Sequence, residues 1–142
     1  MEQAVEQILR EFEERSAREW ELWNRAEASN TPIDVDAFLL SVGPATGQLI
    51  NLLAKEAKAK VILEIGSSYG YSTVWLTEAA RATGGMVISL EIHQEKQKQA
   101  RQAVQKAGLD GFVDFRLGDA RESLAKLETA VDFVLLDLWK DL

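Results

Sequence analysis

The chain has 142 residues and a mass of 15.8 kDa, which is the size of one domain with a single hydrophobic core. Hydrophobic residues make up 46% and charged residues 27%, with nine Gly and two Pro, so a disordered, collagen-like or low-complexity polymer is excluded. The 23 acidic against 16 basic side chains give a formal charge of −7, which would repel nucleic acid and anionic membranes. We therefore expect a small-molecule partner.

The sequence contains no cysteine, which excludes disulfides, thiolate zinc sites and cysteine nucleophiles. This absence favours a reducing, cytoplasmic setting. No apolar run approaches the roughly 18 residues of a membrane span. The first residues also lack the basic and apolar regions of a signal peptide. We expect a cytoplasmic protein with no membrane segment.

The first third of the sequence is predicted to be helical. Apolar residues recur at helical spacing over residues 2–28, which predicts a long amphipathic helix with an acidic outer face. Its apolar stripe either packs on its own domain or serves as a lid or dimer arm. A short helix capped by Asp34 or Asp36 is expected to follow, through Leu40.

A further helix is predicted to begin near Pro44, because proline suits the first turn of a helix. Its expected apolar face comprises Leu49, Ile50, Leu52, Leu53 and Ala57. No Gly/Ser-rich or Pro-rich tether follows this helix. Residues 1–58 are therefore predicted to be a helical extension packed on an α/β part, residues 59–142.

The remaining sequence alternates between strand and helix patterns. Apolar runs are found at 61–65, 86–92, 113–117 and 131–136, and helical segments at about 72–82, 94–107 and 120–128. Such alternation requires crossover connections and predicts a parallel sheet with helices on both faces. The runs are apolar at odd and even positions, as expected for strands covered on two faces.

Candidate site residues follow the strands, because ligands bind an open parallel sheet at the carboxyl ends of its strands. Gly66 and Gly70 define a tight loop after the first strand, where a ligand can approach the backbone. The dinucleotide fingerprint requires glycine where Ser68 stands, so an NAD-binding oxidoreductase is disfavoured. Glu91 ends the second strand and is placed to accept hydrogen bonds from a ribose diol; alternatively it is a solvated acid at a helix start.

The third and fourth strands each end in acidic residues. Asp119 could face an adenine amino group, and with Glu122 it also matches a helix capping box; the two roles are compatible. Asp137 and Lys140 could bind a metal and act as a base, or form a surface ion pair. The single histidine, His93, is predicted to be exposed at a helix start.

Aromatic residues lie close to these strand ends. Tyr69 and Trp75 are predicted to pack in the interior rather than stack on a base. Trp139 either packs or walls an acceptor site.

Five motifs together resemble the catechol and caffeoyl-CoA O-methyltransferases, which are S-adenosylmethionine-dependent enzymes. They are VGPATGQ (42–48), LEIGSSYGYST (63–73), SLEI (89–92), GDA (118–120) and LDLWKD (136–141). The resemblance covers about residues 35–142. It implies the Rossmann-like sheet of class I methyltransferases, with strand order 3-2-1-4 present here and later strands missing.

The resemblance also implies a cofactor, S-adenosylmethionine, and a set of contacts. The implied cofactor-binding residues are Val42, Gly43, Glu64, Gly66, Tyr71, Ser72, Glu91, Ile92, Asp119 and Ala120. Those before residue 73 would approach the methionine portion, with Glu64 supporting the loop. Glu91 would hold the ribose, and Ile92, Asp119 and Ala120 would border the adenine.

The implied reaction is methyl transfer to a hydroxyl group of a small, catechol-like acceptor. Lys140 matches the general base of the catechol enzymes, and Asp137 matches the first ligand of a Mg²⁺-type ion that would lower the pKa of the acceptor hydroxyls. The other metal ligands of the family follow its fifth strand, so Asp137 is an incomplete site. We expect no tight metal binding by this chain.

The family continues beyond the fourth strand, whereas this sequence ends at Leu142. We therefore expect one truncated methyltransferase domain, residues 1–142, that supplies the cofactor-binding half. An apolar fourth strand at a sheet edge predicts a homo-oligomer, formed through residues 131–139 or the N-terminal helix. The alternatives are a non-catalytic nucleoside-binding or self-associating α/β module and, less favoured, an NAD-binding oxidoreductase.

Overall fold

The computed structural model describes residues 1–138 and contains five α-helices, two 3₁₀ helices and four strands within them. In chain order these are α1 (Gln3–Ala28), η1 (Val35–Ala37), α2 (Gly43–Glu56), β1 (Val61–Ile65), α3 (Tyr71–Thr83), β2 (Met86–Glu91), α4 (Gln94–Lys106), η2 (Asp110–Phe112), β3 (Val113–Leu117), α5 (Ala120–Ala125) and β4 (Phe133–Leu136). The predicted alternation of strand and helix is confirmed.

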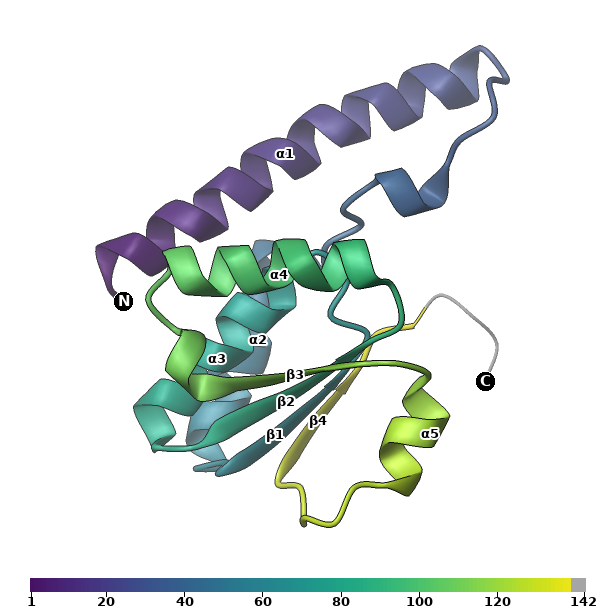
Figure 1. Cartoon of the computed structure of the whole chain (residues 1–142). Coiled ribbons are helices and arrows are strands. Elements are labelled where there is room, and N and C mark those ends of the chain that lie inside the picture. Colours follow the sequence, from purple (N-terminus) through teal and green to yellow (C-terminus); the bar gives the residue numbers. More distant parts are fainter. Residues whose placement is uncertain (139–142) are drawn as a thin grey trace.

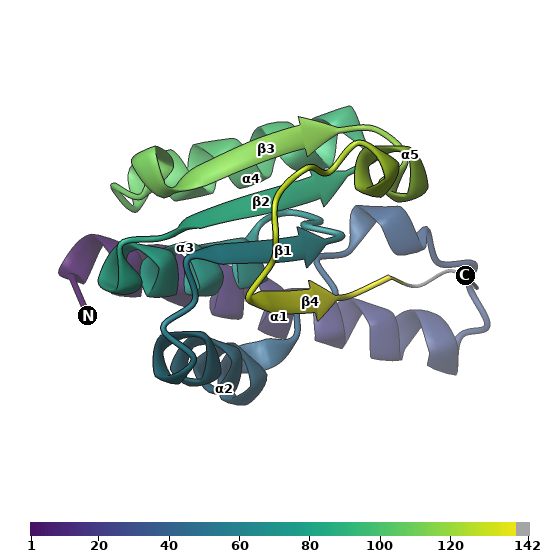
Figure 2. The same ribbon diagram turned by 90° about the horizontal axis from the view of Figure 1, so that it is seen from below.

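The four strands form one parallel sheet in the order β3-β2-β1-β4, as predicted. Ile65 of β1 lies beside Leu90 of β2 on one side and Leu136 of β4 on the other. The chain places β2 and β3 on one side of β1 and β4 on the opposite side, so the winding direction reverses between β1 and β4. All four strands end at the same edge of the sheet (Figure 2), which is where a ligand site is expected.

The helices cover the two faces of the sheet unequally (Figure 1). One face packs against α2, α3 and α4, and the first half of α1 adds Val5, Ile8 and Leu9 to the same core. The opposite face has a smaller core, in which Leu63 and Ile88 contact Ala120 of α5 and the segment that follows it. Within residues 1–138, no helix combines the length and apolarity needed to cross a bilayer.

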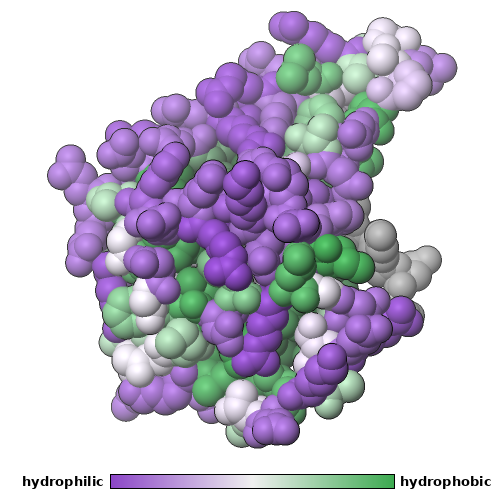
Figure 3. Space-filling model, viewed as in Figure 1, coloured by the Kyte–Doolittle hydropathy of each residue, from purple (hydrophilic) through white to green (hydrophobic). Residues whose placement is uncertain are grey.

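The long helix α1 packs on its own domain along its first half only. Its second half exposes Trp20 and Leu22, while Trp23 makes an edge-to-face contact with Phe38 at 5.4 Å between ring centroids. Hydrophilic side chains cover much of the outer surfaces of α1 and α4 (Figure 3). The apolar stripe of α1 thus serves its own core and, further along, the connection to α2.

The predicted apolar face of α2 is wrong in part. Leu49, Leu52 and Leu53 are exposed, Leu52 at 63%, whereas Gly47 and Asn51 are buried. A Cβ atom at Gly47 would collide with the Trp75 indole, so only glycine lets the two helices approach this closely. The Asn51 amide donates to the Trp75 carbonyl oxygen at 2.8 Å and to the Glu78 carboxylate at 2.6 Å. Close packing at Gly47 and the hydrogen bonds of Asn51 therefore decide which face of α2 is buried, although burial of the leucines would remove more apolar surface from water.

The expectation of strands covered on both faces holds for β1 and β2 but not for β4. Val134 and Leu136 of β4 are each 53% exposed. β4 pairs with β1 alone among the described strands, and α5 lies against β2 rather than β4. The strand is also shorter than predicted, since the side chain of Asp132, just before it, accepts hydrogen bonds from Lys60 N and Val61 N.

Candidate functional site

A cavity of about 450 Å³ opens at the carboxyl edge of the sheet. We call it the strand-end cavity. The loops after β1, β2, β3 and β4 line it together with the connection between α1 and α2, residues 29–42. Its lining residues are Val35, Asp36, Phe38, Leu40, Gly66, Ser68, Leu90, Glu91, Ile92, His93, Lys96, Gly118, Asp119, Ala120, Arg121, Asp137 and Leu138.

The loop after β1 is shaped by glycine. Gly66 has a φ of +92°, a conformation that L side chains rarely adopt, and its N–H donates to the Leu90 carbonyl oxygen at 2.9 Å. A Cβ atom at Gly66 would collide with the Asp137 carbonyl oxygen. The loops after β1 and β4 therefore meet at the point where the winding reverses, and glycine is needed for that contact.

Glu91 holds the loops after β1 and β2 together. One carboxylate oxygen accepts the Ser68 N–H at 2.8 Å, and the other accepts the N–H groups of Ile92 at 2.8 Å and His93 at 2.9 Å. The side chain is buried yet lines the strand-end cavity. Its orientation is therefore fixed by the backbone on both sides, and a carboxylate with two oxygens has capacity for further hydrogen bonds.

Glu64 lies beneath the same loop and is 0% exposed. Its carboxylate accepts hydrogen bonds from the hydroxyls of Ser72 at 2.6 Å, Thr73 at 2.6 Å and Ser89 at 2.7 Å. Burial raises the pKa of Glu64; the three hydroxyls lower it and nearby Asp137 raises it further, with a net increase. The cluster ties the start of α3 to β1 and β2 under the cavity.

The raised pKa of Glu64 predicts a pH-dependent stability. At pH values just above 4.5, the ordinary pKa of a glutamate, Glu64 keeps its proton in the folded state but has lost it in the unfolded chain. The free energy of unfolding should therefore fall as pH rises from this value through the folded-state pKa. We expect urea unfolding of the wild type to show this fall relative to Glu64→Gln, whose residue 64 does not titrate. If the free energy of unfolding of the wild type rose with pH relative to that of Glu64→Gln, the raised pKa of Glu64 would be contradicted.

Asp119 and Asp137 complete the acidic lining. The Asp119 carboxylate caps α5 by accepting the Arg121 N–H at 2.8 Å, and the Arg121 guanidinium lowers the pKa of Asp119. The helix-capping role is thus present, at a residue that also lines the cavity. Burial raises the pKa of Asp137, whose N–H donates to the Ile65 carbonyl oxygen. Lys140, the predicted base, lies outside the described residues, as does Trp139.

The structure brings together six of the predicted site residues at the strand-end cavity. These are Gly66, Glu91, Ile92, Asp119, Ala120 and Asp137. Five others lie outside its lining: Val42, Gly43, Glu64, Tyr71 and Ser72. Their roles toward the cofactor stay predictions.

Tyr71 has a different environment from the strand-end cavity. Its ring packs edge-to-face on Phe12, with 5.8 Å between centroids, and its hydroxyl donates to the Glu13 carboxylate at 2.8 Å. Burial raises the pKa of Tyr71; a hydrogen bond with the Trp75 side chain lowers it and the Glu13 carboxylate raises it again, with a net increase. Tyr69 and Trp75 are buried as well, in agreement with their predicted packing roles.

The connection between α1 and α2 contributes a wall that the sequence reasoning missed. Val35, Phe38 and Leu40 line the cavity from this segment. Its position depends on distant partners: the Tyr69 hydroxyl donates to the Asp36 carbonyl oxygen at 2.5 Å, and Lys96 pairs with the Asp36 carboxylate at 2.9 Å. These contacts join residues 33 and 60 positions apart, so no local pattern in the sequence announces them.

The next question is whether the side chains of the described residues could bind a metal ion. Among residues 1–138, no group of three or more His, Asp or Glu side chains could hold a metal ion. His93, confirmed as an exposed residue at the start of α4, lines the cavity but gathers no such group. Asp137 is the one predicted metal ligand among the described residues.

Sequence comparison relates the chain to known enzymes. The sequence family described as O-methyltransferase matches residues 13–141. The chain is 35% identical over 100 residues to a catechol O-methyltransferase of Niastella koreensis, which covers 70% of this chain and 45% of that protein. It is 28% identical over 120 residues to mouse catechol O-methyltransferase, covering 81% of this chain and 45% of the mouse protein. The chain spans about half the length of the curated relatives it matches.

Solved structures agree in fold. The S-adenosylhomocysteine complex of a Bacillus cereus O-methyltransferase superposes with a TM-score of 0.68 at 28% identity, over 96% of this chain and 55% of that one. The S-adenosylhomocysteine-bound Podospora anserina methyltransferase PaMTH1 superposes with a TM-score of 0.73 at 25% identity, over 97% of this chain and 51% of that one. Because the family match extends over residues 13–141 and the fold agrees with these enzymes, the chain belongs to the O-methyltransferase family.

Proposed function

We propose that the chain binds S-adenosylmethionine and takes part in methyl transfer to a hydroxyl group of a small, catechol-like acceptor. The observation that carries this proposal is Glu91, a buried carboxylate fixed by Ser68, Ile92 and His93 at the mouth of the strand-end cavity. Relatives solved with S-adenosylmethionine or S-adenosylhomocysteine support the cofactor. The lack of cysteine supports a reducing, cytoplasmic setting.

The residues present fit this cofactor. Glu91 offers carboxylate oxygens to a ribose diol, and the close backbone at Gly66 admits the amino-acid portion. Exposed Ile92 and Leu138 provide apolar surface of the kind that a planar base covers, and Asp119 offers an acceptor for an amino group. We infer that these groups bind the nucleoside across the ends of β1, β2 and β3.

Methyl transfer requires the protein to align the methyl group with the acceptor oxygen more than to activate the methyl donor. When bound, S-adenosylmethionine supplies a methyl group on a sulfonium that carries its own leaving group. The chain's residues must then hold the nucleoside and exclude water. Phe38 and Leu40 would shield the cavity from solvent. Glu91 would fix how deeply the nucleoside enters the cavity. Removal of the acceptor proton is assigned to Lys140 on the resemblance to the catechol enzymes.

A Mg²⁺-type ion does not fit the described residues. Asp137 is a single carboxylate, whereas Mg²⁺ demands near-octahedral oxygen coordination. Asp137 and Leu138 line the strand-end cavity on the side of β4. We propose a small hydroxylated aromatic acceptor there, supported by the catechol and caffeoyl-CoA relatives.

A glycine substitution tests the cofactor site. Gly66→Ala would force a Cβ atom onto the Asp137 carbonyl oxygen and narrow the cavity, so we expect the S-adenosylhomocysteine affinity to fall at least about tenfold. Gly111→Ala is the matched control, because a Cβ atom there meets nothing within 4 Å. Isothermal titration of both variants checks this. Equal affinities in the two variants, or tighter binding of NADH by the wild type, would contradict the proposal.

We also propose that the chain self-associates through β4 or through α1. The edge of β4 has backbone groups that no described strand pairs, beside exposed Val134 and Leu136. We expect sedimentation velocity at tens of micromolar to give a species larger than 15.8 kDa. Val134→Lys should shift the distribution toward the monomer, and a wild type that sediments as a monomer would contradict the proposal.

A further inference from the structure

The connection between α1 and α2 has two parts that differ in burial. Residues 38–42 are buried or half-buried, and the Leu39 N–H donates to the Glu19 carboxylate of α1 at 2.9 Å. Residues 29–37, by contrast, include no buried residue. We call residues 29–37 the gate segment. Exposed segments with few buried contacts are the parts of a fold that open most readily.

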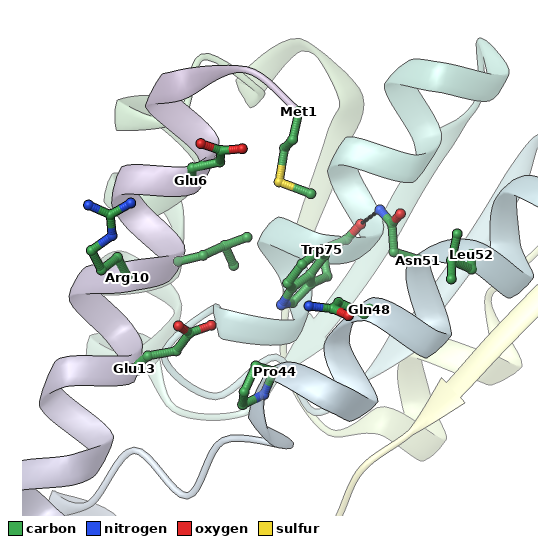
Figure 4. Close-up of a pocket in the computed structure, with 10 residues that line it drawn as sticks. Met1, Glu6, Arg10, Glu13, Pro44, Gln48, Asn51, Leu52 and Trp75 are labelled. Carbon is green, nitrogen blue, oxygen red and sulfur yellow. Dashed lines mark hydrogen bonds between the residues drawn. The ribbon is translucent and has the colours of Figure 1, made fainter.

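Helix α1 gives residues 38–42 a fixed support. Its first half packs on α3 and faces α2 across a cavity of about 620 Å³ (Figure 4). Val5 and Ile8 of this half are buried in the main core. Further along the helix, the Ser16 and Ser41 hydroxyls are hydrogen-bonded at 3.1 Å. The part of the connection that follows the gate segment is therefore anchored to the body of the domain.

The gate segment covers the end of the strand-end cavity where the nucleoside is proposed to bind. Val35 and Asp36 line this cavity together with Ile92 and His93, which follow β2. Figure 2 shows the gate segment beyond the ends of β1 and β2. A nucleoside held by Glu91 would lie between the strand ends and the gate segment. Exchange of that ligand therefore requires the segment to move.

Asp36 makes the polar contacts that hold the gate segment against the cavity. Its carbonyl oxygen accepts the Tyr69 hydroxyl at 2.5 Å, and its carboxylate pairs with Lys96 at 2.9 Å. The Tyr69 ring is buried, with the Arg15 guanidinium 4.5 Å and the Lys96 ammonium 5.5 Å from its centroid. The Asp36 side chain is 68% exposed, so its ion pair with Lys96 is weak enough to break during exchange.

The gate segment has its own internal hydrogen bonds. The Asp34 carboxylate accepts the Asp36 N–H at 3.2 Å, and the Asp34 carbonyl oxygen accepts the Ala37 N–H at 3.1 Å. Asn30, where the chain leaves α1, has a φ of +53°, a left-handed conformation that is uncommon outside glycine. The 3₁₀ helix η1 can therefore move as a unit about its junctions with α1 and with residues 38–42.

We propose that the gate segment opens to let S-adenosylmethionine enter and S-adenosylhomocysteine leave, and that the contacts of Asp36 with Lys96 and Tyr69 keep it closed. The proposal rests on the proposed function, because it concerns exchange at the same cofactor site. These contacts hold the gate segment closed in the free and in the occupied chain alike. Their loss therefore speeds entry and exit together and leaves the affinity almost unchanged. Lys96 is thus a positioning residue.

Surface plasmon resonance of the immobilised chain with S-adenosylhomocysteine separates the two rates. We expect Lys96→Met to raise the association and dissociation rate constants about fivefold each, with a change in Kd of less than about twofold. Lys96→Arg keeps the charge and should retain the wild-type rates. Lys98→Met is the matched control, because it removes the same charge from a residue of α4 outside the strand-end cavity, and it should change neither rate.

The absence of cysteine from the sequence permits a second test. In the double variant Asp36→Cys, Lys96→Cys, a bis-methanethiosulfonate reagent joins the two thiols and locks the gate segment. We expect the lock to slow both association and dissociation of S-adenosylhomocysteine at least about tenfold, and a reductant to restore them. Circular dichroism establishes that each variant is folded.

The outcomes distinguish the gate from the cofactor site. Wild-type rates in Lys96→Met, or a cross-linked chain that exchanges S-adenosylhomocysteine as fast as the reduced one, would overturn the gate and leave the cofactor site in place. A change confined to the dissociation rate and Kd would show that Lys96 contacts the ligand, which also overturns the gate. A folded wild type that binds no S-adenosylhomocysteine would overturn the proposed function, and the gate with it.

Discussion

Glu64→Ala is expected to lower the free energy of unfolding by about 4 kcal/mol. The substitution removes the acceptor of three hydroxyls, those of Ser72, Thr73 and Ser89, in a site that is 0% exposed. Unsatisfied buried donors each cost about 1–3 kcal/mol, and an unfilled space at the base of the loop adds to the loss. A domain of this size has only about 5–15 kcal/mol of stability, so the effect is large.

Urea denaturation followed by circular dichroism measures this change. Glu56→Ala, at the exposed end of α2, is the matched control and should change stability by less than about 0.5 kcal/mol. Glu64→Gln keeps the volume and one acceptor oxygen, so it should fall between the two. If Glu64→Ala lost less than about 1 kcal/mol, the three hydroxyls would have other partners and the cluster would not support the loop.

Glu91→Ala is expected to weaken S-adenosylhomocysteine binding by about 100-fold. Two hydrogen bonds from a ribose diol to a carboxylate account for roughly 3 kcal/mol, which corresponds to that factor. The substitution also releases the N–H groups of Ser68, Ile92 and His93, which fix the rims of the cavity. Isothermal titration calorimetry of the variant and the wild type measures the ratio.

Two controls separate a ribose contact from a loosened loop. Glu95→Ala removes a glutamate four positions along the chain that does not line the strand-end cavity, and binding should be retained. The wild type should bind adenosine more tightly than 2′,3′-dideoxyadenosine, and Glu91→Ala should bind both alike. Unaltered binding of S-adenosylhomocysteine by Glu91→Ala would remove the ribose assignment.

Much of the fold follows from local patterns in the sequence. The run Val61–Ile65 and the glycine after it predict both β1 and the tight loop, because strand formation and positive φ angles depend on nearby residues. The acidic residues at strand ends also reach one edge of the sheet by topology alone. Glu91 could therefore be placed at the cavity from its position in the sequence.

Features that depend on distant contacts could not be predicted. The buried face of α2 is determined by Gly47 and Asn51 and not by the leucines of the helix. Both residues contact Trp75, which follows Asn51 by 24 residues in the sequence. The wall of the cavity from the connection between α1 and α2 relies on Tyr69 and Lys96. Hydrophobic patterning describes which residues favour burial, but not which helix faces approach closely enough to bury them.

The most direct test of the cofactor-binding claim is isothermal titration of the wild-type chain with S-adenosylhomocysteine. The described lining of the strand-end cavity already includes residues that follow each of the four strands, so we expect saturable binding at one site per chain, with no requirement for Mg²⁺. Circular dichroism of the same sample establishes that the protein is folded. A folded chain that gives no binding at millimolar ligand would contradict the proposed function and favour a non-catalytic α/β module.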